Sequence, residues 1–379
     1  MRILQISAAY KPAYVYGGPT MSVSGLCEQL VKSGCYIDVY TTTANGLHEL
    51  DVIPNHTLAV DGVNVTYFKR ITKDHSHFSP ALLKAVWKTA KTYDVMHIHA
   101  WWNLVSVIAC FIAIWHKVPV LVSARGTLSP YSFQNKNRMI KLLIHNLISK
   151  PLLKKCHFHT TSKREHEAIN KVIKSKSITS IFNFVKQPIS HRSPVNNSSS
   201  IFKLLFLSRI EEKKGLNILI SALSQVKVQF HLTIAGSGDQ DYITRLKSLA
   251  INKNISESIT WTGFVNENKF EILQQHDLFV LPSYDENFGN VVIESLAVGT
   301  PVLISDQVGL ADYVVKNQLG WLCQTNSRSV AENIEKIAGQ QAELDRIRHQ
   351  APDLICSDFN ENRLTVKYID LYNTIAALN

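Results

Sequence analysis

The chain has 379 residues, 45% of them hydrophobic, so it is long enough to bury two or three separate cores. Its longest apolar run, LVSVIACFIAIW at 104–115, is shorter than the roughly 20 residues that span a bilayer, which excludes this run as a membrane-spanning helix. The net charge of +10 is uneven, because residues 1–200 hold 24 basic and 9 acidic side chains, whereas residues 201–379 hold 16 and 21.

The basic first half indicates an anionic partner, which could be membrane lipid, nucleic acid or a phosphorylated substrate. The alternative is a basic surface that only keeps the protein in solution.

The six cysteines include no CxxC pair, and no charged leader with a cleavage site precedes the apolar strand that begins at residue 3. We therefore expect a cytoplasmic protein whose cysteines are reduced thiols.

Short apolar strands alternate with helical patterns along the first half of the chain. We predict strands at 2–8, 36–42, 63–68, 94–100, 119–124 and 157–162, and helices at about 20–33, 80–92 and 103–116. These strands are apolar without alternation, which is typical of a parallel sheet that is covered on both faces. Strands that alternate with helices in this way form right-handed βαβ units.

The same alternation of strands and helices begins again after SHRSPVNNSSS at 190–200, a polar segment that we interpret as a linker. We predict further strands at 203–210, 230–238, 258–265, 277–283, 301–306 and 320–323, and helices from about 216, at 240–252, near 267–275 and after 289. The fold class is therefore α/β, with two Rossmann-like domains at 1–189 and 201–358 that face each other across a cleft. Ligands of such sheets bind beyond the carboxyl ends of the strands.

Three predicted strands of the second half are each followed by a polar loop. Arg209 and Lys214 follow the first strand, AGSG at 235–238 ends the second, and DENFGN at 285–290 follows a later one. Because parallel strands end at one edge of their sheet, we expect these loops to converge. A helix that starts near Gly289 offers free N–H groups to a phosphate, and the two basic side chains supply the charge that a diphosphate requires.

Two glutamates stand eight residues apart around this helix start. Glu294 lies one to two turns into the helix, where its carboxylate suits a neutral diol such as a ribose. Glu286 precedes the helix, nearer the reacting end of a ligand. The alternative is an acid at a helix entry and a solvated acid further along, since acids are enriched in first helical turns.

Several motifs of the chain resemble those of a known family. The motifs Glu286-x7-Glu294, Arg209-x4-Lys214, AGSG (235–238), TGFV (262–265) and GTPVLISD (299–306) are similar to those of the retaining nucleotide-sugar glycosyltransferases of family 4, of the bacterial surface-polysaccharide type. The resemblance implies the GT-B fold, with an acceptor domain first, a donor domain second, and a last helix at 359–379 that crosses back onto the first domain.

The resemblance also implies roles for individual residues. Arg209 and Lys214 would bind the donor diphosphate together with the helix start at Phe288, Gly289 and Asn290, and with the first-half glycine loop at Gly17 and Gly18. Glu294 would bind the ribose, while Glu286 and Asn287 would bind the donor sugar, with Glu286 acting at the reacting face. Neither a cofactor nor a metal is expected, because the basic pair can neutralise the diphosphate.

One departure from the family pattern follows the strand PVLVS. The family usually has His-Gly there, and this chain has Arg125-Gly126. Arginine stays protonated and cannot act as a base, but Arg125 would stabilise the charge of a departing phosphate. His99 is the alternative catalytic side chain near the acceptor, followed by Trp101, Trp102 and Asn103 on the acceptor side.

The segment NKNRMIKLLIHNLISKPLLKK at 135–155 is basic and amphipathic. Its basic residues are Lys136, Arg138, Lys141, Lys150, Lys154 and Lys155, and its apolar ones include Met139, Ile140, Leu142, Leu143, Ile144, Leu147, Ile148, Leu152 and Leu153. Such a helix can lie in the interface of an anionic membrane, where a lipid-linked glycan acceptor would be found. The alternative is a buried helix with a solvated basic rim.

Other motifs do not occur in the chain. GxxxxGK[ST], HExxH and GxSxG are all absent, and we assign no DxD triplet to a metal-held diphosphate. No strand carries the interleaved aromatics of an RNA-binding protein, so nucleic acid is not expected as a partner. We therefore predict a glycosyltransferase that uses a nucleotide-sugar donor and a glycan or lipid-linked glycan acceptor. A nucleotide-sugar 2-epimerase of the same architecture and a non-catalytic nucleotide-sugar binding protein stay open as alternatives.

Overall fold

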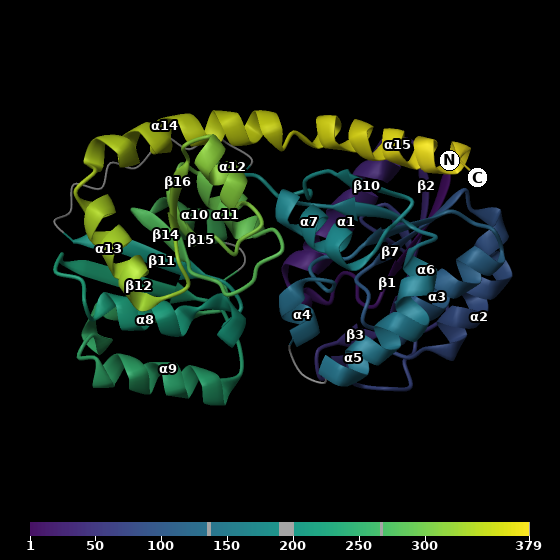
Figure 1. Cartoon of the computed structure of the whole chain (residues 1–379), viewed down its shortest axis with the longest axis horizontal. Coiled ribbons are helices and arrows are strands. Elements are labelled where there is room, and N and C mark those ends of the chain that lie inside the picture. Colours follow the sequence, from purple (N-terminus) through teal and green to yellow (C-terminus); the bar gives the residue numbers. More distant parts are fainter. Residues whose placement is uncertain (135–137, 189–200, 266–267, 379) are drawn as a thin grey trace. The chain divides into compact units, whose positions relative to one another are not determined.

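The computed structural model describes residues 1–134, 138–188, 201–265 and 268–378, so the predicted linker at 190–200 lies outside the described residues. The chain forms two compact units (Figure 1). Unit 1 comprises Met1–Phe184 and Glu361–Asn379, and unit 2 comprises Val185–Asn360. The division falls a few residues before the predicted end of the first domain, and the last helix belongs to unit 1.

Unit 1 is built on an eight-stranded sheet of order β10-β9-β8-β7-β1-β2-β6-β5. Its strands are β1 (Arg2–Ser7), β2 (Tyr36–Thr42), β5 (Thr57–Val60), β6 (Val63–Phe68), β7 (Val95–His99), β8 (Val120–Ser123), β9 (His157–Thr160) and β10 (Ser177–Ser180), and a small hairpin of β3 (Ala44–Asn45) and β4 (His48–Glu49) stands apart. All neighbours are parallel except the edge strand β5, which runs antiparallel to β6. The chain moves outward from β1 in one direction and then returns to β7 on its other side, so the strand order reverses between β1 and β7.

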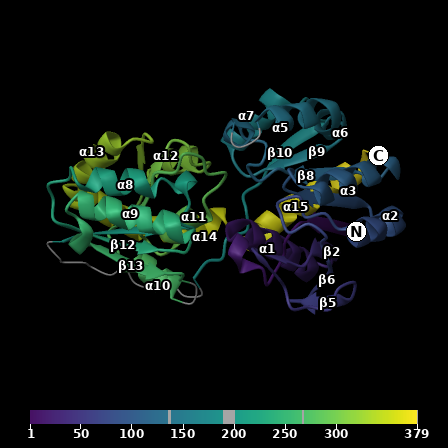
Figure 2. The ribbon, with the colours of Figure 1, turned by 90° about the horizontal axis from the view of Figure 1, so that it is seen from below.

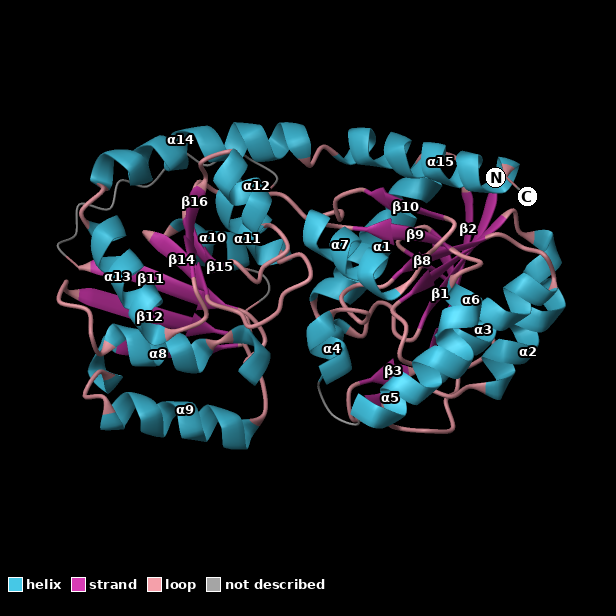
Figure 3. Cartoon of the chain, viewed as in Figure 1, coloured by secondary structure: helices cyan, strands magenta, loops and turns pink. Residues whose placement is uncertain are grey.

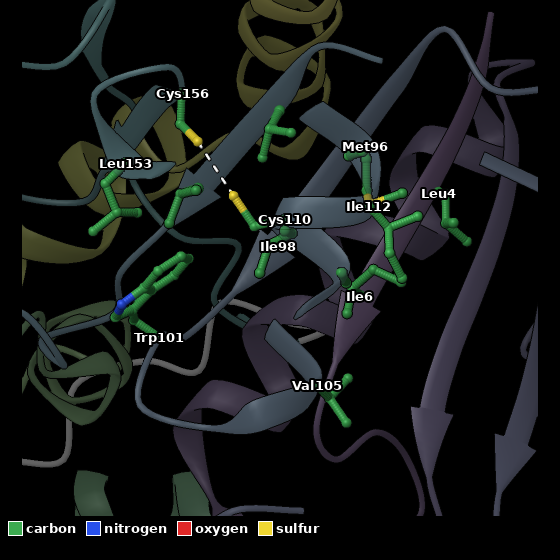
Figure 4. Packing of buried hydrophobic residues seen from close by; sticks show 14 of the residues in the cluster. Leu4, Ile6, Met96, Ile98, Trp101, Val105, Cys110, Ile112, Leu153 and Cys156 are labelled. Carbon is green, nitrogen blue, oxygen red and sulfur yellow. Dashed lines mark hydrogen bonds between the residues drawn. The ribbon is translucent and has the colours of Figure 1, made fainter. Parts of the chain in front are cut away.

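Helices cover both faces of this sheet (Figure 2). They are α1 (Gly18–Lys32), α2 (Pro80–Thr89), α3 (Leu104–Trp115), α4 (Pro130–Gln134), α5 (Arg138–Ile144), the π-helical turn η3 (His145–Ser149), α6 (Lys150–Leu153), α7 (Lys163–Val172) and α15 (Glu361–Ala377), with short 3-10 turns η1 (Tyr14–Tyr16) and η2 (Ala90–Thr92). Alternate residues of a strand belong to two different hydrophobic cores, one on each face of the sheet. In β1, Leu4 and Ile6 pack with α2 and α3, whereas Ile3 packs with α1 and α15. The first core includes Trp101, Cys110 and Cys156 (Figure 4).

Unit 2 has a wholly parallel six-stranded sheet of order β13-β12-β11-β14-β15-β16. Its strands are β11 (Phe202–Leu207), β12 (Phe230–Ala235), β13 (Ile259–Gly263), β14 (Leu278–Leu281), β15 (Val302–Ser305) and β16 (Gly320–Cys323). Its helices are α8 (Leu216–Leu223), α9 (Gln240–Asn252), α10 (Lys269–Gln274), α11 (Asn290–Ala297), α12 (Ala311–Lys316), α13 (Ser327–Ala338) and α14 (Gln341–Asp358), with 3-10 turns η4 (Glu212–Lys214) and η5 (Ser256–Ser258). The strand order reverses between β11 and β14, with helices on both sides of the sheet (Figure 3).

The predicted fold class is confirmed: each unit is a Rossmann-like α/β domain with a parallel sheet. The apolar strand runs at 36–42, 63–68 and 320–323 were predicted to the residue. Strands β3, β4, β5 and β10 were not predicted. The residues of β5 (TLAV) and β10 (SITS) are mostly half-buried or exposed, and their apolar runs are too short to indicate a strand. Within the described ranges, no helix is both long and apolar enough to cross a membrane.

Candidate functional site

The polar loops of unit 2 lie where its strand order reverses. The loop after β11 carries Arg209 and Lys214, and the loop after β14 leads to Glu286; these strands are direct neighbours. Gly215 joins the loops, since it has φ +72° and a Cβ there would lie 2.1 Å from the carbonyl oxygen of Pro282. Only glycine permits this approach, which places both loops beside the reversal point, the usual ligand site of open α/β sheets.

The loop after β12 joins them from the other side. The amide of Ile210 donates to the carbonyl of Ser237 over 2.8 Å, and Ile210 forms a parallel bridge with Gly238. The structure therefore brings together the three loops that the sequence analysis singled out, because their strands end at one edge of one sheet.

Each cation of these loops is paired with a carboxylate. Lys214 contacts Glu286 directly, Lys213 lies 3.1 Å from Asp285, and Arg209 lies 2.7 Å from Glu211. Burial alone would raise the pKa of Glu286, but the nearby Lys214, with Lys213 and Arg209 further off, outweighs it and lowers that pKa below 4.5. Glu286 is therefore a carboxylate at neutral pH, and Lys214 has to leave it or share it in order to bind an anion.

The helix α11 begins where a phosphate site was predicted. Gly289 is its N-cap in the left-handed region, with φ +93°, and a Cβ there would come within 3.2 Å of Val292. The ring of Phe288 is buried and packs edge-on against Phe359, with centroids 6.3 Å apart. The side chain of Phe288 therefore belongs to the core, so only its backbone can serve a ligand, as can the backbone of Asn290, the first residue of the helix.

Glu294 lies in α11 and is buried, with 6% of its surface exposed. Its Oε1 accepts from Lys269 Nζ over 2.6 Å, whereas its Oε2 is buried and has no hydrogen-bond partner among the described residues. An unpaired buried carboxylate oxygen is costly unless a ligand donates to it. The sequence analysis missed Lys269. The signal for it was a cation in the first turn of α10, where the helix dipole disfavours positive charge.

The glycine loop of unit 1 leads directly into α1. Gly17 has φ +65° and donates its amide to Tyr14 over 2.8 Å, and Gly18 is the first helical residue. The loop follows β1 and therefore lies at the reversal point of the unit 1 sheet, beside the loop after β7. This is the position that the resemblance predicted for a phosphate-facing loop.

Arg125 follows β8 and has an unusual backbone for a side chain of its size, with φ +51°. Its Nη1 donates to Ser22 over 2.8 Å and to Asn183 over 3.3 Å, and its Nε donates to His99 over 3.3 Å. Burial lowers its pKa from the ordinary value of arginine, but a guanidinium remains charged at neutral pH. None of its described hydrogen-bond partners is a carboxylate. Glu165, which accepts from the neighbouring amide of Gly126 over 3.1 Å, is a nearby acid that raises the pKa of Arg125 without contacting its guanidinium directly.

The structure corrects the predictions made for the residues around β7. His99 is 1% exposed and contacts Gln5 and Arg125, so it has no surface from which to reach an acceptor. Trp101 is fully buried in the first core, as Figure 4 shows, and its predicted acceptor contact is wrong. Asn103 is the N-cap of α3, where its side chain accepts from the amide of Ser106 over 2.8 Å.

Trp102 alone of the predicted acceptor-side residues is half-buried. Its indole N–H donates to the carbonyl of Thr127, and its ring packs edge-on against Phe133 with centroids 5.3 Å apart. The same ring lies 6.5 Å from the ring of His145. Trp102 thus joins the loop after β7 to the start of the segment that contains α4, α5 and η3.

The predicted amphipathic segment is helical from α5 through η3 to α6, whereas Lys136 lies outside the described residues. One set of its apolar side chains is buried or half-buried, namely Leu142, Leu152 and Leu153. A second set is exposed, namely Met139, Leu143, Ile144, Leu147 and Ile148; we call this set the apolar ridge. The buried-helix alternative therefore accounts for only part of the segment.

Comparisons with known proteins agree with this architecture. The family described as "Glycosyltransferase Family 4" matches residues 16–186, and the family described as "Glycosyl transferases group 1" matches residues 190–353. An uncharacterized glycosyltransferase of Methanocaldococcus jannaschii is 25% identical over 404 residues, covering 98% of each chain. The capsular polysaccharide biosynthesis glycosyltransferase CapM of Staphylococcus aureus is 23% identical over 193 residues, which are 51% of this chain and 46% of CapM.

A solved structure is similar over the whole length. Anabaena HepE in complex with UDP and glucose has a TM-score of 0.75 at 20% identity, with 99% of this chain and 100% of HepE covered. One family match lies on each unit, and together they extend from residue 16 to residue 353. The strand order of the sheet reverses between β1 and β7 in unit 1 and between β11 and β14 in unit 2. The chain belongs to the GT-B glycosyltransferases of the family 4 type.

Proposed function

We propose that this glycosyltransferase retains the anomeric configuration and moves a sugar from a nucleoside-diphosphate sugar to a glycan or lipid-linked glycan of a surface polysaccharide. The name of CapM, which refers to capsular polysaccharide, supports the acceptor class, and the UDP and glucose bound to HepE support the donor class. We assign the donor to unit 2, where Lys214 and Glu286 lie in the loops at the reversal point of the sheet and Glu294 lies in α11, the helix that follows the second loop.

The unpaired Oε2 of Glu294 is the observation that carries the donor proposal. A buried carboxylate oxygen without a donor costs about 1–3 kcal/mol, and a ribose hydroxyl would remove that cost. Lys269 holds the other oxygen and thereby fixes the direction in which Oε2 points. A phosphate would be repelled by this carboxylate, so a neutral diol is the ligand that fits.

The diphosphate would be bound by an exchange of partners. In the structure Lys214 pairs with Glu286 and Arg209 pairs with Glu211. A diphosphate takes over both cations, and Glu286 then accepts hydrogen bonds from hydroxyls of the donor sugar. We propose that these cations replace a metal. Turnover should therefore survive EDTA, and a loss of turnover that magnesium restores would refute this part.

We propose a transfer on one face of the sugar. The bond from the anomeric carbon to the diphosphate oxygen breaks, the bond to the acceptor oxygen forms on the same face, and the acceptor proton passes to the departing oxygen. No separate base is then needed, which suits a chain with Arg125 where the family usually has histidine. Arg125 would stabilise the charge of the departing phosphate.

A panel of UDP-, GDP- and ADP-sugars with glycan acceptors tests the activity. A glycosyltransferase releases nucleoside diphosphate only when an acceptor is present, and the anomeric configuration of the product, read by NMR, shows retention or inversion. Isomerised donor without an acceptor would indicate an epimerase. Tight binding of one nucleotide sugar without any product would indicate a binding protein.

We further propose that unit 1 binds an anionic membrane surface through the apolar ridge. Leu147 is 68% exposed and Leu143 60%, and Lys154 and Lys155 are exposed next to them. Apolar side chains at this spacing can enter the headgroup boundary, and each basic residue near an anionic surface adds about 1 kcal/mol. This partner suits a lipid-linked acceptor.

Sedimentation with lipid vesicles tests the membrane proposal. We expect binding to anionic but not to neutral vesicles at low salt. Binding should weaken when Lys150, Lys154 and Lys155 are all changed to Glu, or when Leu143 and Leu147 are both changed to Ser. A matched control changes the exposed Lys171, Lys174 and Lys176 to Glu, with the same change in charge. Equal losses in the two triple variants would refute the ridge as the contact.

A further inference from the structure

A line of buried polar side chains runs through unit 1 from Arg125 to His159 of β9, whose ring reaches the backbone just after β10. After Arg125 it passes through His99, Gln5, Tyr372, His97, Ser123 and His159, and it ends at the backbone carbonyl of Ile181. The six side chains between the two ends are at most 1% exposed. Four neighbouring strands, β1, β7, β8 and β9, and the C-terminal helix α15 contribute to it. We call this line the polar chain.

Successive members of the polar chain are within hydrogen-bond distance. The distances are 3.3 Å from Arg125 Nε to His99 Nδ1, 2.8 Å from His99 Nε2 to Gln5 Oε1, 3.2 Å from Gln5 Nε2 to Tyr372 Oη, 2.7 Å from Tyr372 Oη to His97 Nδ1, 2.7 Å from His97 Nε2 to Ser123 Oγ, 2.7 Å from Ser123 Oγ to His159 Nδ1, and 2.9 Å from His159 Nε2 to the Ile181 oxygen.

The Arg125 end determines the direction of these hydrogen bonds. A guanidinium only donates, so His99 Nδ1 accepts and the ring proton of His99 lies on Nε2. That proton is donated to Gln5 Oε1, which turns the amide N–H of Gln5 toward Tyr372. The hydroxyl of Tyr372 therefore accepts from Gln5 and donates its own proton to His97.

The other end independently requires the same direction. The carbonyl of Ile181 only accepts, so His159 carries its proton on Nε2 and accepts from Ser123 at Nδ1. Ser123 in turn accepts from His97 Nε2, which leaves His97 Nδ1 as the acceptor for Tyr372. All three histidines are thus neutral with the proton on Nε2. Burial agrees, since it lowers the pKa of His97 and His99 well below 6.5 and that of His159 to about 3.

The polar chain begins at a cation that has no hydrogen-bonded carboxylate among the described residues, although the nearby Glu165 interacts with it electrostatically. The other described partners of Arg125 are the neutral oxygens of Ser22 and Asn183. Aligned hydrogen bonds strengthen one another in a low-dielectric interior, and here every acceptor points toward the guanidinium. The polar chain therefore holds Arg125 in one orientation through neutral partners, and the guanidinium keeps its charge and can attract an anion.

We propose that the polar chain positions the Arg125 guanidinium for an anionic group of the substrates, and that Tyr372 is a positioning residue that acts through Gln5 and His99. The inference rests on the proposed function only for what Arg125 binds. Without the Tyr372 hydroxyl, the amide of Gln5 loses its acceptor and can turn round. His99 would then carry its proton on Nδ1, facing the N–H of Arg125, and the contact that orients Arg125 is lost.

Tyr372→Phe tests this inference, and Tyr368→Phe is its matched control. Both tyrosines are buried in α15 one turn apart, and both lose one hydroxyl. Tyr368 lies 2.9 Å from His159 Nε2, but the Ile181 carbonyl already accepts from that nitrogen, so Tyr368 is a side branch. Removing its hydroxyl leaves every hydrogen bond of the polar chain in place.

Histidine nitrogen spectra of the full-length protein provide a readout that needs no substrate. We expect the proton on Nε2 in all three histidines of the wild type, a changed state of His97 and His99 in Tyr372→Phe, and an unchanged pattern in Tyr368→Phe. A wild-type His97, His99 or His159 that carries its proton on Nδ1, or carries two protons at neutral pH, would overturn the inference.

Kinetics with the donor and acceptor that give turnover in the panel provide the second readout. We expect Tyr372→Phe to lower kcat about tenfold with little change in the donor KM, the factor that corresponds to one ordinary hydrogen bond. Tyr368→Phe should retain kcat, and an equal fall in both variants would mean a merely structural role. If Arg125→Gln leaves kcat unchanged, the role of Arg125 in the proposed function is wrong, and the spectra still decide whether the polar chain exists.

Discussion

Replacing Glu286 by Gln tests whether the donor diphosphate has to compete with this carboxylate for Lys214. In the structure Lys214 and Glu286 form an ion pair whose side chains are 12% and 17% exposed, so solvent screens it little. A glutamine keeps the shape and one oxygen acceptor but removes the charge. Lys214 is then held by a hydrogen bond to a neutral amide instead of by an ion pair, and it is easier to recruit.

The size of the effect follows from the two kinds of hydrogen bond. Hydrogen bonds that involve a charged group contribute about 1.5–3 kcal/mol. The bond from the Lys214 ammonium stays in this class in the variant but loses its second charge, so Lys214 is released more easily by about 1 kcal/mol. We therefore expect Glu286→Gln to bind nucleoside diphosphate roughly five- to tenfold more tightly. Turnover should fall strongly, because the carboxylate that contacts the donor sugar is lost.

Isothermal titration calorimetry with nucleoside diphosphate and with the bare nucleoside measures the change. The nucleoside should bind the wild type and the variant equally, since it has no group for Lys214. Asp285→Asn is the matched control, because it removes the charge from the neighbouring Lys213–Asp285 pair, and its affinity for the diphosphate should not change. Weaker diphosphate binding by Glu286→Gln, or tighter binding of both ligands, would refute the exchange of partners.

Acid should weaken the same ion pair. The folded-state pKa of Glu286 lies below 4.5, so the pair contributes its stability above that pH and loses it as the pH falls through the folded-state value. The unfolding free energy of Glu286→Gln should therefore fall less steeply than that of the wild type below about pH 4.5. Urea titrations between pH 3 and pH 7 measure the difference, and parallel curves would contradict the assigned pKa.

Three further predictions concern the rest of the unit 2 site. Glu294→Ala should weaken nucleoside-diphosphate binding by about 1–3 kcal/mol, with a smaller loss for a 2′-deoxy analogue, and equal losses would exclude a ribose contact. Arg209→Ala should lower the affinity for nucleoside diphosphate far more than for nucleoside in the same titrations. Gly215→Ala should lower the free energy of unfolding by more than about 1 kcal/mol, measured in urea, since a Cβ there would overlap the carbonyl oxygen of Pro282; an unchanged midpoint would show that the loop gives way.

The sequence by itself determined the two parallel sheets and where their loops meet. Continuous apolar runs specify strands that are buried on both faces, and parallel strands necessarily end at one edge. For that reason Arg209, Lys214 and Glu286 could be placed in one site from their order along the chain. The same reasoning placed Trp101 wrongly on the acceptor side, although its side chain is fully buried. The end of a strand predicts the position of a residue along the sheet but does not predict which way its side chain points.

Only the tertiary structure decided which side chains are partners. Lys214 contacts Glu286 from 72 residues away, and His97 contacts Tyr372 from 275 residues away. The first pair forms because β11 and β14 are neighbours, and the second because α15 packs against the sheet of unit 1. No local sequence pattern predicts either arrangement. Hydrogen bonds of buried groups depend on angles and distances of a few tenths of an ångström, which packing of the whole unit sets. The sequence therefore indicated the kinds of groups at the site, and packing decided which of them are neutralised, buried or left available to a ligand.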